Sequence, residues 1–413
     1  MRGTAGHCHW IFGSGKALRP DEPESEDLPA HGPRRAPRAV GRIAHRTPRT
    51  GPDRRTRPLH EIAPGARPTA TLPDRPSLLS RALLWAGGLL LLALSIAAAI
   101  TIGPADLAVS DVAAIVGEHL GVANADVTRI QDGIVWDLRL PRTLLAAVCG
   151  AGLAICGAIM QSLLRNPLAD PFVLGISSGA STGAVLVIVL GVGAGAISLS
   201  VGAFVGALVA FGLVLLLAAG AGGGTDRIVL AGVAGTQLFS ALTSFIVTSS
   251  ADAEQTRGVL FWLLGSLAGA DWGDVALCGA VTVVALAACL LSAPALDAFA
   301  FGQDAAAALG VPVGTIRLLL LLVTALLTAT LVSAAGAIGF VGLVLPHAAR
   351  MLVGPGHRLL LPATALIGAV FLVWVDTAAR TVLDPQELPV GVVTALIGVP
   401  AFAAILYRRR GVA

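Results

Sequence analysis

Charged residues are scarce in this chain: they make up only 13% of its 413 positions, whereas hydrophobic residues make up 55%. With a mean hydropathy of +0.81, this composition excludes an ordinary soluble globular protein. A bilayer core of roughly 30 Å needs about 20 consecutive apolar residues per helix. We therefore predict an all-α, polytopic membrane protein with about ten transmembrane helices, whose spans are, to within a few residues, 79–100, 139–160, 172–191, 198–219, 228–248, 273–292, 314–333, 336–353, 361–379 and 389–407.

Small residues are abundant in these runs, for example Gly202, Gly206 and Gly212 within one span. Small residues let helix backbones approach closely in lipid, so these glycines predict tight helix packing. Strand-period alternation is absent, which disfavours an outer-membrane barrel.

Ionisable side chains are almost missing from the middles of the apolar runs. An ion-driven carrier usually holds such groups at membrane depth. The exception is Asp376, which lies near the end of its span one turn before Arg380 and predicts a local ion pair. Because carbonyls of broken helices can also bind sodium, this shortage disfavours a secondary carrier without removing it.

The chain also lacks a motor for ATP hydrolysis. Gly13-Ser-Gly-Lys16 resembles part of a phosphate loop, but the first glycine of the pattern is missing and Ala17 stands where Ser or Thr is needed. His7, Cys8 and His9 are three potential metal ligands in a tail, where such groups are more often incidental. The remaining four cysteines lie inside apolar runs, as small buried hydrophobes do. We expect no catalytic residue, no cofactor and no metal site, and hence not an enzyme.

Two regions divide the chain. Residues 1–77 hold half of the 28 basic residues and many prolines, a composition that cannot bury enough apolar surface to order itself. We predict a disordered tail over 1–77 and a transmembrane domain over 78–413. A start-site artefact is an alternative for the tail, although the next methionine is Met160, so a shorter product would need a non-ATG start near Ser77. The acidic run 21–27 disfavours an organelle transit peptide.

Loop charges predict the orientation. Residues 101–138 carry six acidic side chains and one base, Arg129, whereas the loops on the other side and the C-terminal 408–410 are rich in arginine. The positive-inside rule places both termini in the cytoplasm and requires an even number of spans. We therefore expect a multi-pass protein of the cell membrane.

Three arginines lie on the side of the membrane that this rule disfavours. Arg139 and Arg142 open the second span and Arg380 closes the ninth. Each alone is explained as a snorkelling anchor. Together at one rim they predict the docking of an acidic protein from outside, because arginine pairs well with carboxylates.

Two short polar loops are expected on the cytoplasmic side, at 161–171 and 300–310. The second has helical spacing, with Asp304 near its start and Gly310 as a C-cap. It is either a plain surface helix or the place where an external motor acts on a pore without one.

Residues 78–413 resemble the permease subunits of the vitamin B12 and iron–siderophore ABC importers, the BtuC/FecCD family. The resemblance covers the whole membrane body and rests on separated motifs: Arg139-Leu-Pro-Arg-Thr143, Arg165-Asn-Pro-Leu-Ala-Asp-Pro171, Leu230-Ala-Gly-Val233, Leu309-Gly-Val311, Gly336-Ala-Ile-Gly-Phe-Val-Gly-Leu-Val-Leu-Pro-His347 and Glu387-Leu-Pro-Val-Gly-Val-Val-Thr394.

The resemblance implies a ten-helix fold that works with a second permease copy (identical or a paralogue), two cytoplasmic ATPase subunits and an extracytoplasmic binding protein. It implies no nucleic-acid partner. In similar permeases the corresponding arginines meet acidic residues of the binding protein, which maps docking onto Arg139, Arg142 and Arg380. The family's coupling helix against the ATPase maps onto Gly302, Asp304, Leu309 and Gly310. Gln303 departs from the acidic residue of a Gly-Glu-Glu-like stretch.

A cytoplasmic gate of similar permeases maps onto Thr225 and Asp226, where an acid replaces a small hydroxyl residue. The alternative is that Thr225 or Asp226 caps the helix that follows.

These observations predict the permease subunit of an ABC importer for a ferric siderophore. In this hypothesis, ATP-driven closure of the motor acts on the 300–310 helix and the 161–171 loop and flips the path between two access states. Its lining is expected to be mostly apolar with few charges. Cobalamin or haem are alternative substrates, and an ion-coupled secondary carrier is the alternative from another class.

Overall fold

Ten helices of the computed structural model correspond to the predicted spans. The structure describes residues 78–410, with breaks at 104–106, 123–126, 192–196, 223 and 251, and these residues belong to one unit, Asp74–Ala413. The predicted tail 1–77, with His7, Cys8, His9 and the Gly13–Lys16 motif, lies outside the described residues. The ten helices are α1 (Leu78–Thr101), α4 (Leu140–Leu163), α5 (Ile176–Leu190), α6 (Leu199–Gly220), α7 (Thr225–Ser250), α9 (Trp272–Leu291), α12 (Val313–Ala335), α13 (Val341–Val353), α14 (His357–Thr381) and α15 (Val390–Arg410).

Seven shorter elements connect them: α2 (Val109–His119), α3 (Arg129–Asp132), a π-helix (Gly133–Arg139), a 3-10 turn (Pro171–Leu174), α8 (Ala253–Leu263), α10 (Ala293–Phe299) and α11 (Gln303–Ala308). The described part of the chain contains no strand, which confirms the all-α prediction. Seven helices are long and apolar enough to cross a bilayer, and α5, α13 and residues 390–404 of α15 are shorter apolar helices. The expected number of about ten is therefore approximate.

Two short helices begin later than predicted. The span expected over 172–191 starts with the 3-10 turn and becomes α-helical only after Gly175, whose φ of +73° suits glycine. The span expected over 336–353 opens with non-helical residues, and α13 begins after Phe340, which has a φ of +67°. In both places the chain turns inside the helical body before the helix forms.

Helix α4 is buried along most of its length and packs against α14, α13, α12 and α9. Glycines make the crossings possible. A Cβ on Gly150 would lie 2.1 Å from the carbonyl oxygen of Gly368 in α14, and one on Gly157 would lie 1.9 Å from that of Gly342 in α13. No larger residue fits at either crossing without moving a backbone.

A second close crossing joins α5 to α6. The glycines involved are Gly179, Gly183, Gly202 and Gly206, where an added Cβ would approach the facing backbone to 2.9 Å or less. The packing role expected for Gly202 and Gly206 is confirmed. The expectation for Gly212 is wrong, because a Cβ there would meet nothing within 4 Å.

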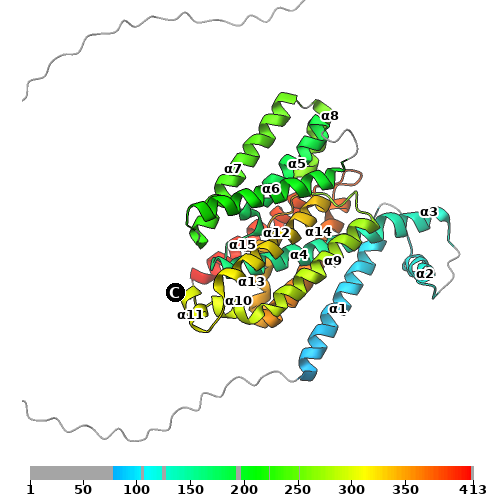
Figure 1. The fold of residues 1–413 in the computed structure, drawn as a ribbon. Helices are drawn as coiled ribbons and strands as arrows, with labels where there is room; N and C mark the ends of the chain where they lie inside the picture. The colour runs from blue at the N-terminus through cyan, green and yellow to red at the C-terminus, as the bar shows by residue number, and fades with distance from the viewer. Residues whose placement is uncertain are drawn as a thin grey trace, which may run out of the picture. The chain divides into compact units, whose positions relative to one another are not determined.

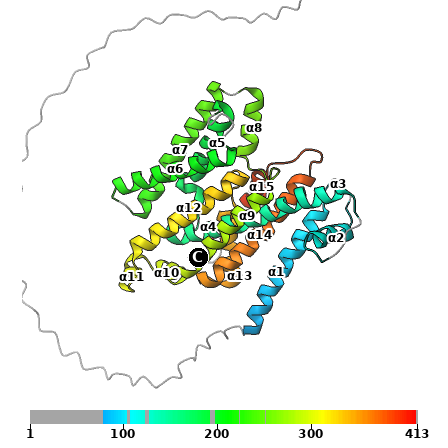
Figure 2. The same cartoon turned by 45° about the vertical axis from the view of Figure 1, so that its right-hand side comes forward.

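The two ends of the helical body carry different short elements. Helices α2 and α3 lie at one end and the α10–α11 hairpin lies at the other, in both views (Figures 1 and 2). We call these the arginine end, which holds Arg139, Arg142 and Arg380, and the hairpin end, which holds α10 and α11. Helix α4, whose 24 residues span about 36 Å, runs between the arginine end and the hairpin end.

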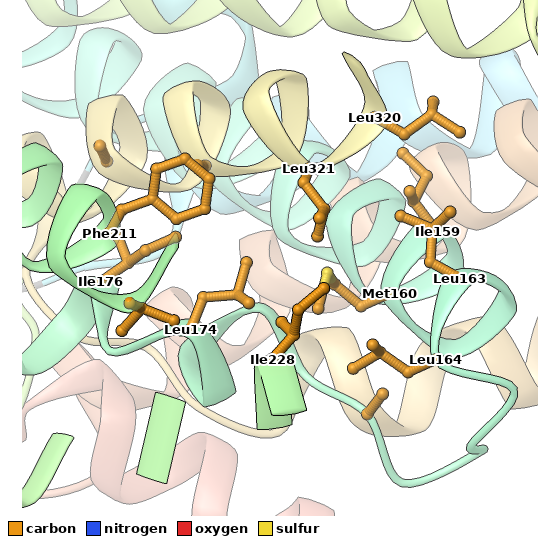
Figure 3. Packing of buried hydrophobic residues seen from close by; sticks show 14 of the residues in the cluster. Ile159, Met160, Leu163, Leu164, Leu174, Ile176, Phe211, Ile228, Leu320 and Leu321 are labelled. Atoms are coloured by element: carbon orange, nitrogen blue, oxygen red, sulfur yellow. The ribbon is translucent and has the colours of Figure 1, made fainter. Parts of the chain in front are cut away.

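Near the hairpin end, apolar side chains of α4, α5, α6, α7 and α12 form one buried cluster. Figure 3 shows Ile228 of α7 beside Met160 and Leu164, which belong to α4 and its C-cap. The four described cysteines, Cys149, Cys156, Cys278 and Cys289, are free and fully buried, as predicted.

Candidate functional site

At the arginine end, Arg142 joins two acidic side chains from distant parts of the chain. Its Nε donates to both carboxylate oxygens of Asp376 at 3.0 and 3.2 Å, and its Nη1 donates to both oxygens of Glu387 at 2.9 and 3.0 Å. The Asp376–Arg380 ion pair predicted from the sequence is present, with 3.6 Å between Oδ2 and Nε. Arg142 is the closer partner of Asp376, because the bidentate geometry suits a guanidinium and a carboxylate.

The other two arginines hold the C-terminus of α1. Arg139 donates to the carbonyl oxygens of Ile100 and Thr101 at 2.8 and 3.3 Å. Arg380 donates to the carbonyl oxygens of Ile102, at 2.6 Å, and Ala99. Positive charge is stabilising at a helix C-terminus, where the last carbonyls have no partner within the helix.

Gly103 permits this arrangement. A Cβ at Gly103 would lie 2.7 Å from Nη2 of Arg139 and 3.2 Å from Nη1 of Arg380. Any larger residue would displace the two guanidinium groups from the end of α1.

The structure thus brings Arg139, Arg142 and Arg380 together at one end, but turns them inward. Arg139 and Arg380 are each 8% exposed, Asp376 is 1% exposed and the side chain of Arg142 is 12% exposed. The sequence suggested the convergence but not the burial. The docking role assigned to these arginines stays a prediction.

At the hairpin end, α11 has the form predicted for a coupling helix. Gly302 precedes it with a φ of +109°, and Asp304 lies exposed in its first turn. Gly310, with a φ of +82°, donates its N–H to Ala307, and Val311 donates to Ala306. These two bonds form a Schellman motif, so the predicted C-cap role of Gly310 is confirmed.

The hairpin presents large apolar side chains to its surroundings. Phe301 is 79% exposed and Leu309 is 72% exposed. They flank the exposed carboxylate of Asp304. Large exposed apolar side chains beside a charged group are typical of a surface that a protein partner covers.

The two residues predicted for the gate meet one of the four predicted coupling residues, Asp304, at a cavity. A volume of about 490 Å³ is lined by Leu164, Arg165, Thr225, Asp226, Gln303 and Asp304. Across it, Nε2 of Gln303 donates to Oγ1 of Thr225 over 3.1 Å. Helix α7 begins at Thr225, and the capping alternative for Thr225 or Asp226 stays a prediction.

The loop at 161–171 is only partly a surface loop. Residues 165–168 are exposed, but Ala169 is buried and Asp170 is half-buried. Asp170 caps the 3-10 turn by accepting from the N–H of Phe172 at 2.9 Å, and burial raises the pKa of its carboxyl to about 6. The loop therefore enters the helical body instead of lying flat on it.

A polar chain at the hairpin end was not expected from the sequence. Nδ1 of His357 lies 2.6 Å from Oδ1 of Asp297, and Nε2 of His357 lies 2.6 Å from Oγ of Ser162. The same Asp297 oxygen accepts from the backbone N–H of His357 at 3.0 Å. Helix α10 is thereby fixed to the start of α14 and to the end of α4.

Helix α7 also carries an exposed polar stripe. Gln237, Ser240, Ser244 and Thr248 are exposed and follow one another at three- and four-residue spacing, which places them on one face. The stripe contains no charge. Among the described residues, no group of three His, Cys, Asp or Glu side chains could hold a metal ion.

Known proteins are similar to this chain in sequence and architecture. A family profile described as the FecCD transport family matches residues 89–408. The cobalamin import system permease protein BtuC of Halobacterium salinarum is 46% identical over 67% of this chain and 74% of that protein. The hemin transport system permease protein HmuU of Yersinia pestis is 41% identical over 67% of this chain and 84% of that protein.

Two further comparisons extend over more of the chain. The iron(3+)-hydroxamate import system permease protein FhuB of Bacillus subtilis is 36% identical over 78% of this chain and 82% of that protein. A solved metal-chelate type ABC transporter in an inward-facing conformation superimposes with a TM-score of 0.70 at 32% identity, covering 79% of this chain and 99% of that one. The relatives are transport permeases, which are not enzymes. The chain therefore belongs to the FecCD transport family, as a multi-pass membrane permease of ABC importers.

Proposed function

We propose that this chain forms the membrane pathway of an importer for a large metal chelate, and first of all for a ferric siderophore. The proposal is supported by the names of its relatives, which carry cobalamin, hemin or iron(3+)-hydroxamate. These cargoes have in common a metal enclosed in an organic ligand. Cobalamin and haem remain the alternative cargoes.

The observation that carries the proposal is the exposed hairpin. Phe301, Asp304 and Leu309 project at one end of a body that contains no ATP-binding motif in its described part. In this proposal each of two permease copies offers this surface to one cytoplasmic ATPase subunit. In this orientation the hairpin end faces the cytoplasm, where the loop charges also predict both termini.

The polar stripe of α7 supports a path between two permease copies. Hydroxyl and amide groups are costly against lipid tails unless they find hydrogen-bond partners within the protein, as Ser240 does with Ser178 at 3.3 Å and Thr248 does with the carbonyl oxygen of Ser244 at 2.8 Å. Gln237, Ser240, Ser244 and Thr248 are better placed along a water-containing path that a second copy completes. A neutral polar lining lets a bulky chelate pass without holding it by charge.

At the opposite end, the arginine cluster is proposed to meet the extracytoplasmic binding protein. In this cluster Arg142 binds both Asp376 and Glu387. Glu387 is the more exposed of the two acids, with 39% of its side chain accessible. An acidic residue of the binding protein would replace Glu387 as the partner of Arg142.

Leu309→Asp tests the assembly with ATPase subunits. The chain is co-expressed with the ATP-binding subunit of the proposed importer, and co-purification and ATP hydrolysis are measured. We expect the variant to lose the subunit while its own folding is unchanged, because Leu309 is exposed. Val122→Asp is the matched control, since Val122 is 79% exposed at the other end. Equal retention of the ATPase by both variants would remove the coupling role.

Cargo is identified by uptake. Cells that lack the chromosomal gene receive a labelled ferric hydroxamate, cobalamin or hemin, and accumulation is measured with and without the restored chain. Restored uptake of the ferric hydroxamate alone supports the siderophore. Uphill transport into vesicles that contain only this chain and an ion gradient would instead show a secondary carrier.

A further inference from the structure

The two halves of the α10–α11 hairpin are attached to the membrane body in different ways. Helix α10 is fixed by Asp297 to the buried ring and the backbone of His357, which also contacts Ser162 of α4. The side chain of His357 is only 5% exposed. Helix α10 therefore moves with α4 and α14.

Helix α11 reaches α7 across an open space. Gln303 lines the cavity of about 490 Å³ together with Thr225 and Asp226, and its amide donates to the hydroxyl of Thr225. A neutral hydrogen bond of this kind contributes about 0.5–1.5 kcal/mol.

Helix α7 is held less firmly near this end than α4 is. One turn after Thr225, Ile228 is 6% exposed and packs into the apolar cluster beside Met160 (Figure 3). Further along, α7 leaves most of its surface uncovered. The first turn of α7 can thus tilt about Ile228 if something pulls on it.

We propose that Gln303 is a positioning residue that ties the first turn of α7 to α11, so that displacement of α11 by an ATP-binding partner moves the cytoplasmic end of α7. This inference rests on the proposed function and adds to it the connection between the coupling helix and the gate. The connection is made by the side-chain amide, not by a charged group.

The charges of the cavity explain why an amide is suited to position 303. Asp226 and Asp304 already place two carboxylates in the lining, against one arginine, Arg165. A glutamate at 303 would add a third negative charge beside them and could not donate to Thr225. An amide at position 303 therefore avoids a third carboxylate in this lining.

The test uses the complete complex with its ATPase subunits in lipid vesicles. Arg227→Cys places a reporter thiol in the first turn of α7, at an exposed position that does not line the cavity. Its rate of labelling by a water-soluble maleimide is measured without nucleotide and after trapping with ATP and vanadate. The chain without the reporter gives the background.

When position 303 is glutamine, we expect trapping with ATP and vanadate to change the labelling rate of the Arg227→Cys reporter several-fold. Gln303→Ala and Thr225→Val should each abolish this change while ATP hydrolysis continues, and their combination should have no further effect. Thr225→Ser keeps the hydroxyl and should keep the response.

Different results would overturn the proposed role of Gln303 and the proposed importer function. Full nucleotide-dependent change of labelling in Gln303→Ala would overturn the role of Gln303 while leaving the importer function intact. A complex that neither retains its ATPase nor hydrolyses ATP in the Gln303 background would overturn the proposed function itself. A purely structural role of Gln303 would lower thermal stability but leave the nucleotide response in place.

Discussion

The arginine end and the hairpin end are held together by different chemistry. At the arginine end, charged groups that have left water bind α1, α4 and α14 to one another through bidentate and charge-assisted bonds. At the hairpin end, Asp297 fixes α10 to His357, but α11 meets α7 through a neutral amide and a hydroxyl beside a cavity. The difference indicates that the arginine end is built to stay fixed and that the contact between α11 and α7 is built to move.

Breaking the fixed end should have the largest effect. Arg142→Ala leaves the carboxylate of Asp376, which is 1% exposed, with Arg380 alone at 3.6 Å. Removing one partner of a buried ion pair costs about 3–5 kcal/mol. We expect a strongly lowered midpoint of thermal unfolding in detergent, followed by tryptophan fluorescence.

Two further variants of the same cluster serve as comparisons for Arg142→Ala. Replacing both partners, by Arg142→Met with Asp376→Leu, should cost less than Arg142→Ala, because no charge is then stranded. Glu387→Gln, at the exposed side of the same cluster, should cost less than about 1 kcal/mol. Unfolding of Arg142→Ala at the wild-type temperature would show that the arginine end is not held by this pair.

An intermediate effect is expected where the hairpin end is anchored. Asp297→Ala removes the acceptor for both the ring and the backbone N–H of His357, and leaving such buried groups unpaired costs about 1–3 kcal/mol. Asp297→Asn keeps an oxygen at this place and should cost less. Equal unfolding midpoints for the two variants would mean that the Asp297 oxygen does not fix α10.

The smallest effect concerns pH at the loop that enters the body. Burial raises the pKa of Asp170 to about 6, so the folded state binds this proton more tightly than the unfolded chain does. The carboxylate therefore lowers stability above pH 6, and its contribution becomes more favourable as pH falls from about 6 toward 4.

Asp170→Asn keeps the cap oxygen for Phe172 without the charge. It should raise stability at pH 7.5 by about 1 kcal/mol, a value reduced by partial solvent access to the side chain. The advantage should shrink below pH 6 and disappear near pH 4, where the carboxyl is protonated in both the folded and the unfolded state. An advantage that does not change with pH would contradict a buried carboxylate at this position.

The sequence predicted the long helices well because hydropathy reports burial in lipid directly. The run expected over 139–160 is α4, Leu140–Leu163, and that over 314–333 is α12, Val313–Ala335. The prediction of helix boundaries was wrong where an apolar run is not helical throughout. The residues before Gly175 and Phe340 are apolar because they enter the body, and only their backbone angles show that the helix has not yet begun.

The site was predicted in part for a similar reason. The convergence of Arg139, Arg142 and Arg380 followed from their places at span ends. The pairing of Arg142 with Asp376, 234 residues apart, depends on the tight crossing of α4 and α14, which hydropathy does not describe. The contacts between Gln303 and Thr225 and between Asp297 and His357 were missed because they join residues whose types are ordinary at helix ends.

The stripe on α7 has a consequence for the life of the protein in the cell. If a second permease completes the path, as proposed above, a newly made copy without it would turn the exposed side chains of Gln237 and Ser244 toward acyl chains. Membrane proteases would recognise these exposed polar groups and degrade such a copy. Synthesis of both subunits in equal amounts would protect it from degradation. The abundance of this chain should therefore follow that of its assembly partner, even when its own messenger is plentiful.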